Sequence, residues 1–389
     1  MNRLKLLALL PLGALLSGCN FVVLSPSGDI ATQQRDLVII STLLMLLIIV
    51  PVMALTALFA WRYRSSNTSA RYEPEWHHST KLELVIWSAP LLIIICLGAL
   101  TWVSTHLLDP FRPLARISAG RPVDPNVKPL TVDVVALDWK WLFIYPEQGI
   151  ATVNELAAPV DRPIDFHITA SSVMNSFYIP ALAGQIYAMP GMESRLHAVI
   201  NKAGTYKGFS ANFSGAGFSG MHFAFFGLPD KQFDGWVGRV KADGGALQKA
   251  DYLQLERPSL NEPVRHYTSV DPDLYRAILN MCVEPGKMCE SDMMTIDEKG
   301  GLGLAGIRNT LPLAYDKYAR RGAVFGAEPS YVAELCTPAA PRGQETVSES
   351  VSQNATPVPG AKVAPPLLTP AAASSRSSFL LGTRRKSDS

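Results

Sequence analysis

Two long apolar runs constrain the fold of this chain more than any other feature of its sequence. They extend over Leu37–Ala60 and Leu84–Leu108, and neither contains Asp, Glu, Lys or Arg. Each run exceeds the ~20 residues that an α-helix needs to cross about 30 Å of hydrocarbon. Helices buried in soluble proteins rarely continue so far without a charge. The sequence therefore predicts two transmembrane helices, residues 37–60 and 84–108, joined by a loop of residues 61–83.

The N-terminus has the pattern of a bacterial lipoprotein signal. A basic start, MNRLK, precedes an apolar stretch, and the small-residue box LLSGC ends at Cys19. We predict that residues 1–18 are removed as a signal peptide and that Cys19 carries the lipid. An ordinary signal peptide or a short membrane helix is the alternative, but the apolar stretch is too short to span a bilayer.

Lipidation of Cys19 decides the orientation of the membrane hairpin. Acyl chains hold such a cysteine at the outer face of the inner membrane, so residues 19–36 are predicted to be periplasmic. Basic residues in the 61–83 loop favour a cytoplasmic location, although further basic residues follow the second span. Two crossings then return the chain to the periplasm. We predict a bacterial inner-membrane lipoprotein with its large C-terminal part in the periplasm.

Residues 130–229 are predicted to form a Greek-key β-sandwich. They follow a proline-rich linker, residues 109–129, and consist of short alternating segments separated by Gly, Pro, Asn and Ser. In the first segment the alternation places four aromatic side chains on one face, namely Trp139, Trp141, Phe143 and Tyr145. Such a stripe buries a large apolar area in a sandwich.

The remainder of the chain predicts helices and then a tail. Residues 230–336 contain stretches of helical periodicity, the first with Phe233, Trp236 and Val240 on one stripe. Residues 337–389 are rich in Pro, Ala and Ser and lack the apolar content to pack, so we predict disorder there. The predicted fold class is a membrane-anchored α+β protein.

Three further cysteines fall in the predicted periplasmic part, where disulfides persist. A short loop separates Cys282 from Cys289, which makes this pair a candidate disulfide. With Cys336 the three cysteines allow three pairings. A metal site is disfavoured because no histidine lies between Cys282 and Cys289.

The segment GTYKGFSANFSGAGFSGM resembles the dinuclear copper loop of cytochrome oxidases, which reads G-x-Y-x-G-Q-C-S-E-x-C-G-x-x-H-x-x-M. Ser210 and Ser214 stand at the two bridging thiolates, and Asn212 stands at the acidic residue. Phe218 replaces the histidine and Met221 is retained. In the upstream stretch VMNSFYIPALAGQIYAMPGM, the place of the second histidine is taken by Asn175. Because copper favours thiolate and imidazole ligands, the resemblance implies a domain that keeps the frame without the metal.

From the lipobox to about Val240 the chain resembles subunit II of the cytochrome-o-type ubiquinol oxidases, in the haem–copper oxidase superfamily. The resemblance is carried by FAWRYR, LTWVSTHLLDP, VVALDWKWLFIYPEQGIATVNELA and FSGAGFSGM. It implies a cupredoxin-like domain on a two-helix hairpin, docked on a catalytic subunit I that holds the haems and copper. Subunits III and IV are the other implied partners. This chain would have no cofactor and no catalytic residue of its own.

The implied complex oxidises ubiquinol, reduces oxygen to water and moves protons outward. Quinol travels in the lipid, so a copper centre projecting into the periplasm is unnecessary. In copper-containing relatives a tryptophan near Trp139 admits electrons from cytochrome c, but without an acceptor metal we interpret Trp139 as a packing residue. The net charge of +2 gives no reason to expect nucleic acid as a partner.

Glu83 is the one acid that suggests chemistry, because it stands at the cytoplasmic start of the second span. The resemblance places it at the family glutamate implicated at the mouth of a proton pathway into the catalytic subunit. The alternative is an interfacial acid that pairs with Lys81 or is solvated by headgroups.

Two other functions compete with this interpretation. The first is a copper-bearing cytochrome c oxidase subunit, against which the missing thiolates at Ser210 and Ser214 argue. The second is a lipid-anchored periplasmic binding or copper-delivery protein, for which a pair of cysteines or a Met/His-rich surface is expected. The sandwich region, residues 130–229, contains no cysteine.

Overall fold

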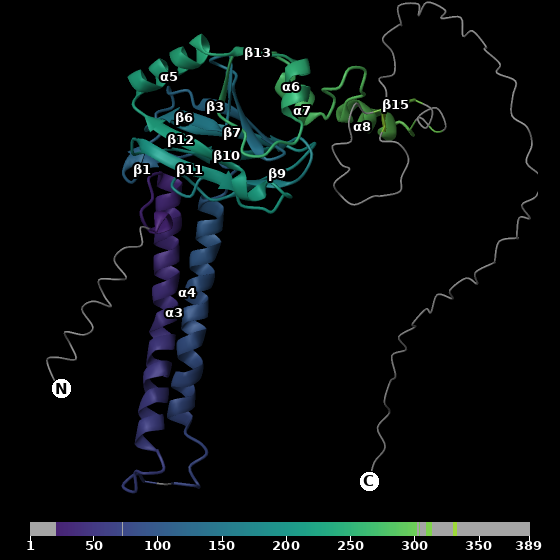
Figure 1. Ribbon diagram of the computed structural model, residues 1–389. Coiled ribbons are helices and arrows are strands. Elements are labelled where there is room, and N and C mark those ends of the chain that lie inside the picture. The colour runs from purple at the N-terminus through teal and green to yellow at the C-terminus, as the bar shows by residue number, and fades with distance from the viewer. Residues whose placement is uncertain (1–20, 72, 302, 304–308, 313–329, 333–389) are drawn as a thin grey trace, which may run out of the picture. The chain divides into compact units, whose positions relative to one another are not determined.

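A computed structural model describes residues 21–71, 73–301, 303, 309–312 and 330–332 (Figure 1). These residues belong to one compact unit, Met1–Thr337, in which two long helices lie side by side and lead into a β-domain. Cys19, Cys336 and the predicted tail, residues 337–389, lie outside the described residues.

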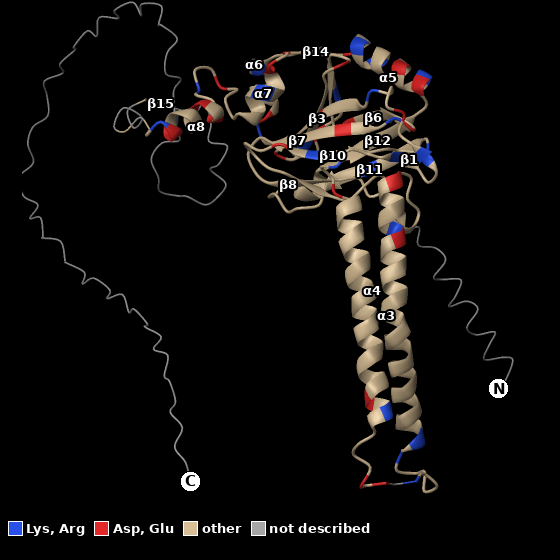
Figure 2. Cartoon of the chain, turned by 180° about the vertical axis from the view of Figure 1, so that it is seen from behind, with Lys and Arg blue, Asp and Glu red and all other residues tan. Residues whose placement is uncertain are grey.

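Helices α3 (Asp29–Arg62) and α4 (Thr80–Leu107) form the antiparallel pair, and they pack against each other. Their most apolar windows have mean hydropathies of 2.9 and 2.4, and none of either window is buried within the protein. Figure 2 shows Lys, Arg, Asp and Glu only near the ends of both helices. The unburied apolar side chains between these ends need hydrocarbon or a partner helix around them, which agrees with two membrane spans. Pro51 and Pro90 lie inside the helices.

The first turns of α3 extend beyond the predicted span and attach to the β-domain. The side chain of Asp29 is only 4% exposed, and its Oδ2 accepts a hydrogen bond from Arg116 Nε at 2.9 Å. Gly28 precedes the helix at a very close approach, because a Cβ there would lie 2.6 Å from the carbonyl oxygens of Leu182 and Val199. Glycine is therefore required where the chain passes between these two segments.

The β-domain is a sandwich of two sheets. The seven-stranded sheet has the order β10 (Ser194–Ala198), β7 (Ile164–Ala170), β3 (Leu130–Leu137), β4 (Lys140–Tyr145), β5 (Ile150–Val153), β14 (Arg265–Val270), β13 (Gly245–Leu247). The five-stranded sheet has the order β6 (Glu155–Pro159), β12 (His222–Leu228), β11 (Gly204–Ser210), β8 (Asn175–Tyr178), β9 (Ile186–Ala188). Most neighbours are antiparallel, while β3–β7, β6–β12 and β13–β14 pair in parallel.

Short elements complete the described structure. Before α3 stands the 3₁₀ helix η1 (Val22–Leu24), and between α4 and β3 lies the two-stranded ribbon of β1 (Arg116–Ser118) and β2 (Arg121–Pro122). The 3₁₀ helix η2 (Phe218–Gly220) precedes β12, and a second ribbon pairs β15 (Thr310–Pro312) with β16 (Ser330–Val332).

The predicted aromatic stripe forms the centre of the sandwich. Trp141, Phe143 and Tyr145 are fully buried, and Trp139 is 5% exposed. Phe143 packs against Phe223 of the opposite sheet with ring centroids 4.9 Å apart. Edge-on and tilted contacts of this kind add to the stabilisation that area burial already gives. The residues that the sequence pattern placed on one face of this segment are therefore the ones that point into the core between the two sheets.

The other face of the seven-stranded sheet is also covered. Side chains that alternate with the stripe, including Leu142 and Ile144, form a second apolar cluster with Tyr252, Leu274 and Ile278. The latter three come from helices α6 (Lys249–Leu255) and α7 (Leu274–Leu279). Strands buried on both faces read as continuous apolar runs. This explains why β3 is apolar at almost every position.

The region after residue 230 contains strands as well as the predicted helices. Helix α5 (Asp230–Ala242) buries Phe233, Trp236 and Val240, the stripe expected from the sequence. Between the helices, β13 and β14 add two strands to the large sheet. Helix α8 (Glu290–Glu298) follows a disulfide between Cys282 and Cys289. The prediction of a purely helical extension missed the strands because RHYTSV, the sequence of β14, is polar and only partly buried.

Candidate functional site

The two loops that resemble a copper site meet at the end of the five-stranded sheet. Asn175 begins β8 and Ser210 ends β11, and these neighbouring strands are paired. The hydroxyl of Ser210 donates to Asn175 Oδ1 at 3.1 Å, and both residues are buried, at 3% and 1% exposure. The Asn175 amide donates in turn to the Val173 carbonyl at 3.1 Å. The two positions that resemble a thiolate and an imidazole ligand are thus joined by a neutral hydrogen bond.

Two more of the predicted positions lie against this pair. The amide of Asn212 donates to the Met174 carbonyl at 3.2 Å and so ties one loop to the other. Met221 is fully buried, and its carbonyl accepts the backbone N–H of Ser210 at 3.3 Å. These positions come together in the structure, and the spacing of the loop is that of the copper-containing pattern although its side chains differ.

Ser214 and Phe218 lie on the outer part of the loop. The Ser214 carbonyl accepts a hydrogen bond from Trp139 Nε1 at 3.0 Å, and the ring of Phe218 packs edge-on against Phe213 at 5.6 Å. A Cβ on Gly217 would lie 2.3 Å from the Trp139 ring, so only glycine fits there. Trp139 therefore packs against the loop at Ser214 and Gly217 and stabilises it.

The donor set of this site does not suit copper. A soft metal binds thiolate and imidazole, whereas the six positions present two hydroxyls, two amides and an aromatic ring besides the thioether of Met221. Over the described ranges, no group of three or more His, Cys, Asp or Glu residues is placed to hold a metal ion.

A cluster of titratable groups lies elsewhere, on the outer face of the large sheet. His167 contacts Asp133 through Nδ1 at 3.4 Å and Asp165 through Nε2 at 3.3 Å, and His197 Nδ1 lies 3.4 Å from Asp165. The hydrogen bonds that His167 donates to Asp133 and Asp165 raise its pKa to about 9. His167 and His197 are 30 positions apart in the sequence, and the cross-strand register, which pairs His197 with Asp165, brings them together.

Glu83 lies in the first turn of α4, at the end of the hairpin away from the β-domain. Its carboxylate is 2.7 Å from His78 Nδ1, and its side chain is 48% exposed. The side chain that contacts Glu83 is therefore His78 rather than Lys81. The exposure of the carboxylate is compatible with proton uptake from water, and the proton-entry role of Glu83 stays a prediction.

Two family models match parts of this chain. Residues 130–225 match the family model for the periplasmic domain of cytochrome c oxidase subunit II, and residues 241–286 match the COX aromatic rich motif. The crystal structure of the periplasmic domain of subunit II of cytochrome oxidase from Bradyrhizobium japonicum is 25% identical, with a TM-score of 0.29; the likeness covers 31% of this chain and 98% of that one. The family match over residues 130–225 defines the class of the β-domain as the periplasmic domain of cytochrome c oxidase subunit II.

Curated relatives narrow the class to one family. Cytochrome bo(3) ubiquinol oxidase subunit 2 of Pseudomonas putida is 51% identical over 278 residues, covering 71% of this chain and 86% of the relative. Ubiquinol oxidase subunit 2 of Acetobacter aceti is 49% identical over 265 residues, covering 68% and 84%. The chain belongs to the cytochrome bo(3) ubiquinol oxidase subunit 2 family. This confirms the predicted family and the fold class of a two-helix hairpin with a cupredoxin-like domain.

Proposed function

We propose that this chain is the non-catalytic subunit II of a proton-pumping ubiquinol oxidase in the aerobic respiratory chain. It supports the haem-bearing catalytic subunit and has no redox centre of its own. The observation that carries the proposal is the buried Asn175–Ser210 hydrogen bond, which occupies the place where the copper-containing class needs imidazole and thiolate. A complex that takes electrons from a quinol in the lipid has no need of a periplasmic copper centre.

The partner of the hairpin is the catalytic subunit I, which holds the haems and copper, and subunits III and IV complete the complex. The apolar side chains exposed on α3 and α4 support this part of the proposal. Because the two helices contact each other along one side only, the apolar side chains on their other sides remain uncovered. Lipid and partner helices supply the remaining contacts.

The chain is anchored in the inner membrane by two spans and by lipid on Cys19, with the β-domain in the periplasm. The apolar segment directly after Cys19 supports this placement. Phe21, Val22, Val23 and Leu24 are each 46–61% exposed. Such a segment is suited to the membrane surface.

Purification of the complex through this chain in a mild detergent tests the proposal. We expect haem and copper to copurify, and both to remain with the catalytic subunit when subunit II is dissociated. Oxygen consumption should be supported by ubiquinol and not by reduced cytochrome c. Stoichiometric copper in the separated subunit II, turnover with cytochrome c, or purification of the chain without haem-bearing partners would each contradict the proposal.

A further inference from the structure

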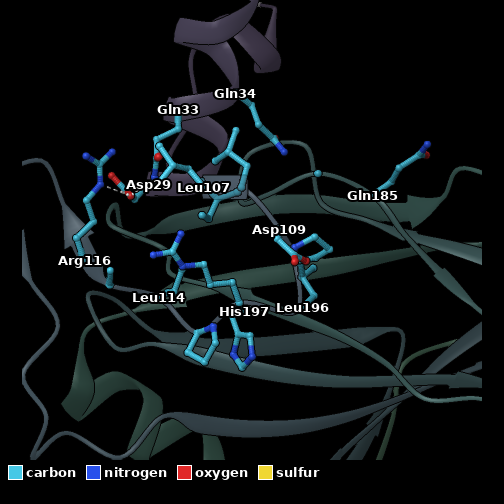
Figure 3. A pocket seen from close by; sticks show the side chains of 17 residues that line it. Asp29, Gln33, Gln34, Leu107, Asp109, Leu114, Arg116, Gln185, Leu196 and His197 are labelled. Atoms are coloured by element: carbon cyan, nitrogen blue, oxygen red, sulfur yellow. Dashed lines mark hydrogen bonds and ion pairs between the residues drawn. The ribbon is translucent and has the colours of Figure 1, made fainter. Parts of the chain in front are cut away.

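A cavity of about 280 Å³ lies where the membrane hairpin meets the β-domain (Figure 3). One wall is formed by the first two turns of α3, and another by the end of α4 with the linker that follows. Segments next to β9 and β10 close the third side. The cavity is separate from the loop that contains Ser210, and nothing in the proposed function uses it.

The cavity lies at the depth of lipid headgroups. On α3, Gln33 precedes the apolar run that begins at Leu37 by about 6 Å, at 1.5 Å per residue. On α4, Leu107 and Leu108 end the second apolar run and line the cavity themselves. Because the polar region of a bilayer adds roughly 5–8 Å on each side of the hydrocarbon, this level is that of the outer headgroups.

One cationic group in the cavity is held in a fixed orientation. Arg116 donates through Nε to the buried carboxylate of Asp29, which also accepts from Gln33 Nε2 at 2.7 Å. Figure 3 shows this ion pair at one side of the cavity, near Gln33. The two terminal amino groups of the Arg116 guanidinium form no hydrogen bond with the part of the chain that the structure describes. They are available to an anion.

A second cation and a second acid lie in the linker. Arg112 is exposed and uses Nη1 alone, in a hydrogen bond to the His106 carbonyl at 3.2 Å. Asp109 accepts the backbone N–H of Phe111 through Oδ1 at 3.0 Å, and its Oδ2 has no hydrogen-bond partner among the described residues. The charged side chains of the lining are therefore Arg112, Arg116, Asp29 and Asp109, which are balanced in sign.

We propose that this cavity binds a zwitterionic phospholipid headgroup, with its phosphate at the two arginines and its primary ammonium at Asp109. Guanidinium groups match the geometry of phosphate oxygens, and the carboxylate complements the ammonium. A lining of zero net charge suits a ligand that is itself neutral overall. Ile30, Leu107 and Leu114, which also line the cavity, provide apolar contact for the glycerol and the start of the acyl chains.

The test is native mass spectrometry of the delipidated oxidase complex, titrated with phosphatidylethanolamine or phosphatidylglycerol. We expect Arg112→Gln to weaken phosphatidylethanolamine binding about tenfold or more, since it removes a charge-assisted hydrogen bond. Asp109→Asn should remove the preference for phosphatidylethanolamine over phosphatidylglycerol. Arg121→Gln is the matched control, because Arg121 lies on the same linker, outside the cavity, in an exposed ion pair with Asp161.

Each contrary result overturns the proposal. If Arg112→Gln binds as much lipid as Arg121→Gln, the cavity is not the site. Equal affinity for the two lipids in the unaltered complex excludes recognition of the ammonium. Displacement of the bound lipid by millimolar inorganic phosphate shows a simple anion site instead. Haem spectra of each variant verify that the complex has assembled, and the exposed position of Arg112 makes the substitution compatible with folding.

Discussion

At the scale of single residues, Glu83 is the position where a functional role can be separated from a structural one. It is half exposed and contacts His78, so its removal leaves no buried group without a partner. We predict that Glu83→Ala slows oxygen consumption with ubiquinol while the haem content and subunit composition of the complex remain unchanged. Proton uptake from the cytoplasmic side is the step that the carboxylate would assist.

Glu75 provides the control for this experiment. It lies in the same loop, where its backbone carbonyl contacts His77 Nδ1 at 2.7 Å and its carboxylate has no ionic or hydrogen-bond partner among the described residues. Glu75→Ala should therefore leave turnover unchanged. Equal rates for the Glu83→Ala and unaltered enzymes would show that Glu83 is merely an interfacial acid.

In contrast to Glu83, Ser210 is expected to have a structural role only, although it stands at a position that resembles a copper ligand. Its hydroxyl hydrogen-bonds to Asn175 and accepts from the backbone N–H of Ser176 at 3.4 Å. Ser210→Ala leaves both buried partners unsatisfied, which we expect to destabilise the subunit by about 1–3 kcal/mol. Thermal unfolding of the complex should show the loss, with turnover unchanged at permissive temperature. Slower turnover at unaltered stability, with the exposed Ser219→Ala as control, would instead indicate a part in electron transfer.

At the scale of elements, the contact between the sheet and the helical region depends on pH. His167 on β7 is held between Asp133 and Asp165, and the hydroxyl of Tyr275 on α7 donates to Glu193 at 3.4 Å beside them. Arg195 and His197, both on β10, also face this cluster, and burial lowers the pKa of His197. The cluster thus joins three strands of the sheet to the helix that covers them.

The raised pKa of His167 sets the direction of the pH dependence. Its pKa is about 9 in the folded chain against an ordinary value of 6.5, so the protonated form is stabilised by folding. The stabilisation is complete below pH 6.5 and is lost as the pH rises through about 9. We predict that the unfolding temperature of the complex falls over this window, and that His167→Gln flattens the fall. The exposed His222→Gln is the control, and an identical pH profile for His167→Gln and the unaltered chain would exclude the effect.

Elements with a local signal were predictable from the sequence, and elements that depend on pairing were not. The apolar runs of α3 and α4 and the alternation from Trp139 to Tyr145 have periods that a short window reveals. The site positions from Asn175 to Met221 were predictable for a different reason, since the spacing of the loop resembles a known pattern. By contrast, β14 is recognisable only from its pairing with β5, and the His167 cluster only from the register of β3, β7 and β10.

At the scale of the whole molecule, the proposed lipid on Cys19 would give the chain a second kind of membrane attachment besides its two spans. Each transmembrane helix inserts a long apolar run, whereas a single acyl chain binds only reversibly and even several acyl chains anchor a protein less firmly than a transmembrane helix. Lipid on Cys19 is therefore not needed to keep the chain in the membrane. We expect the lipid to act locally instead, on residues 21–24 and on the start of α3, whose first two turns line the cavity beneath the β-domain.

Substitution of Cys19 separates these two attachments. We predict that Cys19→Ser abolishes incorporation of labelled fatty acid and the corresponding mass, while the chain remains in the membrane fraction after alkaline carbonate washing. Assembly with the haem-bearing subunit should persist, because the contacts of α3 and α4 are unchanged. Cys96→Ser, in the exposed middle of α4, is the matched control and should retain the label. Release of the Cys19→Ser chain by carbonate would show that the hairpin does not span the bilayer, and the orientation of the β-domain inferred from two crossings would have to be abandoned.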